Sequence, residues 1–143
     1  MAARLWLLLH RPLWFDEIFT VWAARLPFDK LLAILTNDSG PPLFYVFEKP
    51  FVLAAERLDL SDAAARAVPF AATLALFAGV LALPSRAARI RFTLLAAASP
   101  LLSLYSAEAR AYALLALFCF ALFLLAAVLR ETPAALAATA LLT

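Results

Sequence analysis

The run 111–129 contains no charged residue, and it constrains the fold of this chain more than any other feature. A transmembrane helix needs about 20 consecutive apolar residues, so this run predicts a membrane span. The composition agrees, because 66% of the 143 residues are apolar and 15% are charged, whereas soluble domains average about 45–50% and about 25%. The same excess of apolar residues excludes intrinsic disorder. The sequence therefore predicts an all-α integral membrane protein with several transmembrane helices.

Further apolar runs give the expected course of the chain through the membrane. The predicted spans are 63–83, 90–106 and 111–129, with the start of another at 134–143. The loop between the first two is basic, with Arg86, Arg89 and Arg91, and Arg130 follows the third. Basic loops favour the cytoplasmic side, so residues 105–112 and the region before the first span are expected outside. Because the first and last apolar runs of the chain are too short to span, we expect the N-terminal part of a longer protein.

The region about 16–62 is predicted to form one long external loop with two amphipathic helices, roughly 17–36 and 42–58. In the second helix, the charged residues fall within one half of a helical wheel and large apolar residues lie largely opposite. The charged set is Glu48, Lys49, Glu56, Arg57 and Asp59, and the apolar set is Phe44, Phe47, Phe51 and Leu58. Such a helix suits the membrane interface better than its interior. The proline pair suits its first turn, and Pro50 is expected to kink it.

Counts of residue types exclude two classes of site. Cys119 and His10 are the single cysteine and histidine, so a disulfide framework or a zinc site built from the Cys and His of this chain alone is ruled out. The twelve Lys and Arg residues are scattered, with no basic stripe between aromatic residues, and no nucleic-acid partner is expected.

Several ionisable residues are expected at one membrane face, near the ends of neighbouring helices. They are Asp16, Glu17, Asp38, Glu108 and Arg110. Carboxylates there are suited to deprotonating a hydroxyl, and Asp16, Glu17 and Glu108 are candidate ligands for a divalent cation such as Mg²⁺ or Mn²⁺. An arginine is suited to gripping a phosphate with two parallel hydrogen bonds.

Each of these residues also has a simpler interpretation. Asp16 is at a suitable place for a helix N-cap, and Asp38 for a turn and cap. Glu108 and Arg110 would then be solvated turn residues. Nearby tyrosines and tryptophans are typical anchors at a membrane interface.

Four blocks of sequence are more specific in their order than any single residue. They are LWFDEIFTVWAA, NDSGPPLFYVF, DAAARAVPFAA and SPLLSLYSAEARAYALL. In order and spacing they resemble the GT-C class of membrane glycosyltransferases, particularly the RgtA/B/C/D-like and dolichyl-phosphate-mannose protein mannosyltransferase (PMT)-like families. The resemblance implies a first external loop with two amphipathic helices. It also implies inverting transfer of a sugar from a polyprenyl-phosphate donor to a hydroxyl-bearing lipid, polysaccharide or protein. The expected place is the extracytoplasmic face of a bacterial plasma (inner) membrane.

The resemblance also assigns roles to individual residues. Asp16 and Glu17 match the acid pair of the family's first loop, with Asp16 as the general base. Glu108, Arg110 and Tyr112 match the family's Glu-x-Arg-x-Tyr turn, which implies binding of the donor and its phosphate.

The proline-pair block is similar to the family's pattern with one departure. Asp38 matches the family's aspartate before the prolines and, with Tyr45, is expected to position the acceptor or the loop. Relatives often have His or Lys where this chain has Gly40, so Lys49 is expected to supply that contact to the donor phosphate.

Two other classes of function stay open. A secondary transporter would also have ionisable residues at the membrane. Here, however, the charged residues lie at the ends of the predicted spans rather than in their middle. The sequence also shows no pair of repeated apolar segments interrupted by Gly or Pro, which is typical of transporters. A non-catalytic or truncated membrane subunit agrees with the length of the chain, whereas the retained acids favour an enzyme.

Overall fold

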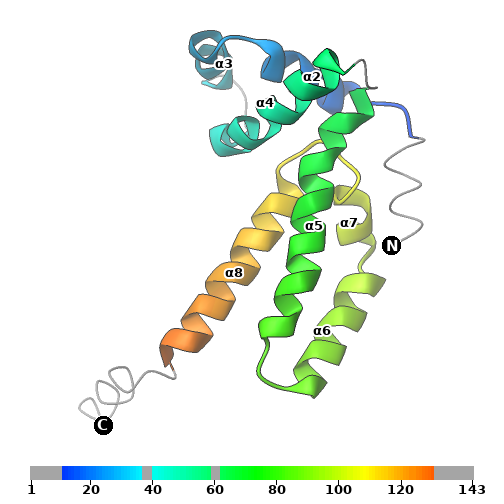
Figure 1. The fold of residues 1–143 in the computed structure, drawn as a ribbon, viewed down its shortest axis with the longest axis vertical. Helices are drawn as coiled ribbons and strands as arrows, with labels where there is room; N and C mark the ends of the chain where they lie inside the picture. The colour runs from blue at the N-terminus through cyan, green and yellow to red at the C-terminus, as the bar shows by residue number, and fades with distance from the viewer. Residues whose placement is uncertain (1–10, 37–39, 59–61, 131–143) are drawn as a thin grey trace.

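The computed structural model describes residues 11–36, 40–58 and 62–130, and these residues form helices joined by short connections (Figure 1). The elements are α2 (Phe15–Arg25), α3 (Phe28–Leu35), α4 (Pro42–Arg57), η1 (Asp62–Arg66), α5 (Ala67–Gly79), η2 (Val80–Ala82), α6 (Arg86–Ala98), α7 (Pro100–Tyr105) and α8 (Tyr112–Arg130). No strand occurs in these three ranges. The prediction of an all-α fold is therefore confirmed for the part of the chain that is described.

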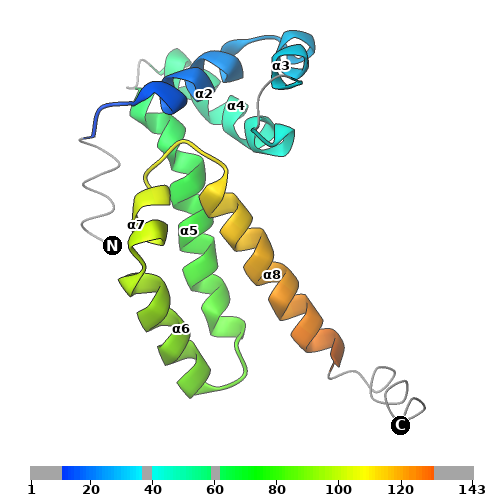
Figure 2. The same ribbon diagram turned by 180° about the vertical axis from the view of Figure 1, so that it is seen from behind.

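The helices form two layers (Figures 1 and 2). Helices α5, α6 and α8 run along the long axis of the molecule, and α2, α3 and α4 lie across one end of it. The connection between η2 and α6 is at the far end, whereas the loop between α7 and α8 returns to the end that carries α2 and α4. This loop contains Glu108 and Arg110, so the chain brings them to the layer that contains Asp16 and Glu17.

Small residues let the long helices approach closely. A Cβ atom added to Gly79 would lie 2.9 Å from Cε1 of Phe120, so α8 packs against α5 where there is no side chain. The ring of Phe120 lies 4.6 Å from that of Phe92, centroid to centroid, which joins α6 to the same contact. Leu76, Val80 and Leu83 belong to the same buried cluster as Phe120.

One helical stretch in the described residues is both long and apolar enough to cross a membrane. It is Ala64–Ala82, of 19 residues, and it corresponds to the predicted span 63–83. Helix α8 contains the shorter apolar stretch Tyr112–Ala127.

The predicted span 90–106 is not one helix. Its residues belong to α6 and α7, and α6 begins earlier, at Arg86. The break falls at Ser99, which has an extended backbone and whose hydroxyl accepts a hydrogen bond of 3.2 Å from the amide of Leu102. Pro100 follows at the first position of α7, where its missing N–H is not needed, and it disfavours a helical conformation for Ser99.

The first predicted amphipathic helix, 17–36, is also divided, into α2 and α3. Leu26 ends α2 with an extended backbone, φ −68° and ψ 152°. Pro27 explains the break, because a residue before proline is pushed out of the helical region. The second predicted helix matches α4 closely and continues through Pro50.

The predicted orientation of α4 is wrong for Glu48. This residue was expected on a solvated charged face, yet it is fully buried, and neither carboxyl oxygen has a hydrogen-bond partner in the described residues. Phe47, Phe51 and Leu58 are exposed instead, whereas Phe44 is buried. The reason is tertiary packing: α4 lies against α2, η1 and α5, and the stripe that contains Glu48 faces them.

Glu48→Gln is expected to stabilise the fold near pH 8 and to change little near pH 4.5. Burial raises the pKa of Glu48 from 4.5 to about 8, so the folded protein keeps a proton that the unfolded chain has released. Over that interval the free energy of unfolding falls with rising pH by about 1.4 kcal/mol per pH unit because of this residue. Glutamine does not titrate and removes the slope, which thermal unfolding in detergent micelles at several pH values measures.

The matched control is Glu56→Gln, on the exposed part of the same helix. It is expected to shift the melting temperature by the same small amount at every pH. An unchanged pH slope in Glu48→Gln would contradict the burial of an unpaired carboxyl group.

Candidate functional site

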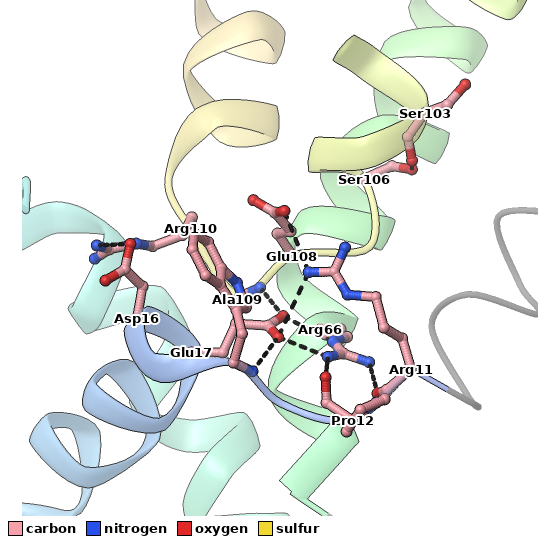
Figure 3. A network of polar contacts seen from close by, with 11 residues as sticks. Arg11, Pro12, Asp16, Glu17, Arg66, Ser103, Ser106, Glu108, Ala109 and Arg110 are labelled. Carbon is pink, nitrogen blue, oxygen red and sulfur yellow. Dashed lines mark hydrogen bonds and ion pairs between the residues drawn. The ribbon is translucent and has the colours of Figure 1, made fainter. Parts of the chain in front are cut away.

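Glu17 and Arg66 form a buried ion pair at the junction of the two layers (Figure 3). The side chains of both are 0% exposed. Nε of Arg66 donates to Oε1 of Glu17 at 2.7 Å, and Nη2 donates to Oε2 at 2.6 Å. The amide of Ala109 donates to Oε1 at 2.9 Å, and the amide of Trp14 donates to Oε2 at 3.3 Å. This one carboxylate therefore ties α2 to η1 and to the loop before α8.

The remaining donors of Arg66 hold the segment before α2. Nη1 donates to the carbonyl oxygen of Arg11 at 2.5 Å, and Nη2 donates to that of Pro12 at 3.0 Å. The planar guanidinium has five N–H donors in a fixed fork, so it is suited to joining several acceptors in a dry site. Arg66 was not among the predicted site residues. Its signal was visible as the one charge in the apolar run 63–83, and an ionisable residue there needs a partner.

Glu17 is held as a carboxylate. Burial raises its pKa, but hydrogen bonds from Arg66 and the amide of Ala109, with the positive charge of Arg66, lower it by more. The net result is a pKa below the usual 4.5. The stability that this pair contributes is therefore present above pH 4.5 and is lost as the pH falls through the lowered pKa. A carboxylate with both oxygens occupied is a poor proton acceptor, so the geometry favours a positioning role for Glu17.

Asp16 and Arg110 form a second, more accessible ion pair. Nη2 of Arg110 lies 2.9 Å from Oδ2 of Asp16, and the side chains are 19% and 35% exposed, respectively. Asp16 is not the N-cap of α2, since Trp14 occupies that position and the helix starts at Phe15. Successive residues of a helix point about 100° apart, so Glu17 faces the core while Asp16 faces Arg110 (Figure 3). Two of the predicted site residues from different blocks thus lie in contact.

Glu108 pairs with Arg11, on the other side of Glu17 from Asp16 (Figure 3). Nη2 of Arg11 donates to Oε1 of Glu108 at 3.2 Å. The Glu108 side chain is 6% exposed, and its second oxygen, Oε2, is buried without a hydrogen-bond partner in the described residues. Glu108 is therefore not the solvated turn residue of the simpler interpretation.

A small cavity of about 90 Å³ lies beside Arg110. Its lining residues are Gly40, Pro41, Phe44, Tyr45, Arg110, Ala111 and Tyr112. The predicted residues Tyr45 and Tyr112 thus lie at the same cavity, and the ring of Tyr112 also packs against Tyr105, with centroids 4.3 Å apart. Asp38 lies outside the described residues, two positions before Gly40.

Lys49 lies against the C-terminal end of α2, and its predicted contact with the donor phosphate stays a prediction. Its Nζ donates to the carbonyl oxygens of Ala24 at 2.9 Å and Leu26 at 2.5 Å, at the C-terminal end of α2. It also lies 5.2 Å from the centroid of the Phe28 ring. A cation at a helix C-terminus satisfies its last carbonyl groups. Lys49 is not among the residues that line the cavity beside Arg110.

The candidate metal ligands do not come together. No group of three or more His, Cys, Asp and Glu side chains that could hold a metal ion occurs in ranges 11–36, 40–58 and 62–130. Asp16, Glu17 and Glu108 each face an arginine instead. These three candidate ligands for Mg²⁺ or Mn²⁺ therefore do not form such a group in the part of the chain that is described.

Comparison of the chain with protein-family models, curated proteins and solved structures finds no match.

Arg66→Met is expected to destabilise the fold by about 3–5 kcal/mol, because it leaves the Glu17 carboxylate buried without its partner. The double variant Glu17→Met/Arg66→Met is expected to lose less than Arg66→Met alone, since no uncompensated charge is then buried. Denaturant or thermal unfolding of the three proteins in detergent micelles measures these differences.

Arg25→Met is the matched control, because Arg25 and Glu56 form an exposed pair with 3.9 Å between Nε and Oε1. Exposed pairs contribute about 0–1 kcal/mol. Equal losses in Arg66→Met and Arg25→Met would show that the Glu17–Arg66 contact is not the junction of the layers.

Proposed function

We propose that this chain contains the catalytic end of a multi-pass membrane glycosyltransferase of the GT-C class. It transfers a sugar from a polyprenyl-phosphate donor to a hydroxyl-bearing acceptor at the extracytoplasmic face, with inversion. The observation that carries the proposal is the Asp16–Arg110 ion pair, 2.9 Å between Oδ2 and Nη2, beside the small cavity that Arg110 lines. It supports the proposal because a carboxylate is suited to accepting a proton and an arginine is suited to binding phosphate.

The blocks of the family resemblance support the proposal because they converge in space. Asp16 comes from the first block and Arg110 from the last. Gly40 and Tyr45, from the proline-pair block, line the same cavity as Arg110. Arg66, from the third block, is the partner of Glu17. Residues from all four blocks therefore lie at the same end of the helices.

The size and chemistry of the cavity suit the phosphate group of the donor. A volume of about 90 Å³ is well below the roughly 300–1,000 Å³ of sites that enclose whole ligands. Arginine binds phosphate with two parallel hydrogen bonds, and the hydroxyl of a tyrosine is a further donor. In this proposal the polyprenyl phosphate leaves toward Arg110, which stabilises the negative charge that grows on its oxygen.

Asp16 is the proposed general base. The acceptor hydroxyl oxygen attacks the anomeric carbon of the sugar, and the bond from that carbon to the phosphate oxygen breaks. The hydroxyl proton moves to the Asp16 carboxylate. Glu17 takes no part in this transfer and instead holds α2 and the 109–110 backbone in place.

The exposed apolar surface supports a location in the membrane. On α4 it includes Phe47 and Phe51, and on α8 it includes Leu122 and Phe123. Large exposed apolar side chains on successive elements indicate a surface that contacts lipid or another protein. We propose that α5 with η1 and η2, α6 with α7, and α8 span a bacterial plasma membrane, with α2, α3 and α4 at its outer interface.

Asp16→Asn in the full-length protein is expected to lower the rate of sugar transfer about 10²–10⁴-fold, the usual contribution of a general base. Asparagine keeps the size of the side chain but does not accept the proton. The measurement is release of polyprenyl phosphate from a panel of polyprenyl-phosphate-linked mannose, glucose and arabinose, with membranes that supply the acceptor.

Asp29→Asn is the matched control, because Asp29 is an exposed acid in the first turn of α3 and is expected to leave the rate unchanged. Transfer by Asp16→Asn at the wild-type rate, with equal expression, would move the base to another residue. No transfer by the wild-type protein from any donor of the panel would contradict the proposed function.

Labelling of cysteines tests the proposed arrangement in the membrane. Lys30→Cys and Arg86→Cys place thiols at exposed positions in opposite layers of the molecule. In a cysteine-free background that includes Cys119→Ala, an impermeant thiol reagent is expected to label position 30 in intact cells. The cysteine at position 86 should react with the reagent only after the membrane is permeabilised. Labelling of both from the same side would contradict a crossing by α5.

A further inference from the structure

A second, larger cavity opens beside Arg11 and Glu108, and none of its lining residues belongs to the cavity beside Arg110. Its volume is about 400 Å³, and it is lined by Arg11, Pro12, Leu13, Trp14 and Glu108. In Figure 3, Arg11 and Glu108 lie on one side of Glu17, and Asp16 and Arg110 lie on the other. The volume is within the range of about 300–1,000 Å³ that small-molecule sites occupy.

The wall of this cavity contains an unsatisfied acceptor. Oε2 of Glu108 is buried and has no hydrogen-bond partner in the residues described, while Oε1 accepts from Arg11 at 3.2 Å. A buried polar atom without a partner costs roughly 1–3 kcal/mol, and more if it is charged. Glu108 lines the cavity, and the last torsion of a glutamate side chain is broad, so rotation of the carboxylate can present an oxygen to a ligand there. A ligand that donates a hydrogen bond would remove the cost.

Two other residues that line the cavity, Trp14 and Arg11, indicate which class of ligand fits it. Trp14 is 46% exposed, and an indole ring offers a flat apolar face. The Arg11 side chain, 24% exposed, offers N–H donors. Arg11 and Glu108 carry opposite charges, so the pair favours neither an anion nor a cation. A matching ligand is neutral, has one apolar flat face, and both donates and accepts hydrogen bonds around its edge.

We propose that this cavity binds the ring of a neutral monosaccharide unit, with one face on Trp14 and a hydroxyl donating to Glu108. The inference depends on the proposed function for its biological meaning, because the ring would belong either to the donor or to the acceptor. Glu108 is then a sugar-binding residue, and not a ligand of the donor phosphate.

Tryptophan fluorescence of the full-length protein in detergent micelles tests the site without any transfer. The probes are the methyl glycosides of mannose, glucose, galactose and arabinose. At least one is expected to change the fluorescence in a saturable way in the wild type and in Trp22→Phe, whose exposed ring does not line the cavity. The change is expected to be absent in Trp14→Phe.

Glu108→Ala and Glu108→Gln are expected to weaken binding about tenfold or more, since a hydrogen bond to a charged group is lost. The control Glu56→Gln should bind as the wild type does.

The inference is overturned if no glycoside gives a saturable change that needs Trp14, or if inorganic phosphate gives a larger one. Where both Glu108 variants fail to fold, loss of the signal in Trp14→Phe decides alone.

Transfer kinetics show whether the bound ring belongs to the donor or to the acceptor. The substrate whose KM rises in Glu108→Gln is the one that supplies the ring. Transfer without a response at Trp14 rejects the cavity and keeps the proposed function. A response at Trp14 in a wild-type protein that transfers no sugar keeps the sugar-binding cavity and rejects the proposed function.

Discussion

The buried Glu17–Arg66 ion pair is the contact on which the rest of this end of the molecule depends. The two side chains bind the backbone at Arg11, Pro12, Trp14 and Ala109, which belong to two separate stretches of chain, the segment before α2 and the loop before α8. Taking two charges out of water is expensive, and the cost is offset only where the geometry is good and the remaining donors and acceptors are satisfied. Here the carboxylate accepts four hydrogen bonds from protein groups. The pair therefore fixes the positions of α2, η1 and the loop before α8 relative to one another.

Asp16 and Glu17 are adjacent acids, and the helix gives them opposite environments. A step of about 100° around α2 turns Glu17 into the dry junction and Asp16 toward the surface. Glu17 is held ionised by Arg66, with a lowered pKa, and its oxygens are occupied. Asp16 pairs with Arg110, and its side chain is 35% exposed. In the proposed enzyme the two adjacent acids therefore have different roles, with Glu17 supporting the site and Asp16 acting as the base.

Much of the helical content could be predicted from apolar runs, because length and the absence of charge are local properties. The start of α4 followed from the proline pair. The breaks at Leu26 and Ser99 were not predicted, although Pro27 and Pro100 explain them. The orientation of α4 was not predictable from its own wheel. A wheel sorts residues by type, but the buried face is decided by which neighbours the helix meets, and Glu48 lies on that face. Arg66 was missed for a similar reason: its charge was visible in the sequence, but its partner is far away along the chain.

The two arginine–carboxylate pairs also differ in how easily a ligand can open them, and this difference bears on the proposed mechanism. Separating Arg66 from Glu17, both 0% exposed, would leave charges buried and unpaired. Arg110 and Asp16, at 19% and 35% exposure, are partly in water, where a pair contributes only about 0–1 kcal/mol. A donor phosphate offers Arg110 two parallel hydrogen bonds and more negative charge than one carboxylate does. Binding of the donor would then draw Arg110 toward the phosphate and release Asp16 for the acceptor hydroxyl. In the proposed enzyme the base becomes available only when a sugar is present to be transferred, while the Glu17–Arg66 pair keeps the surrounding backbone unchanged.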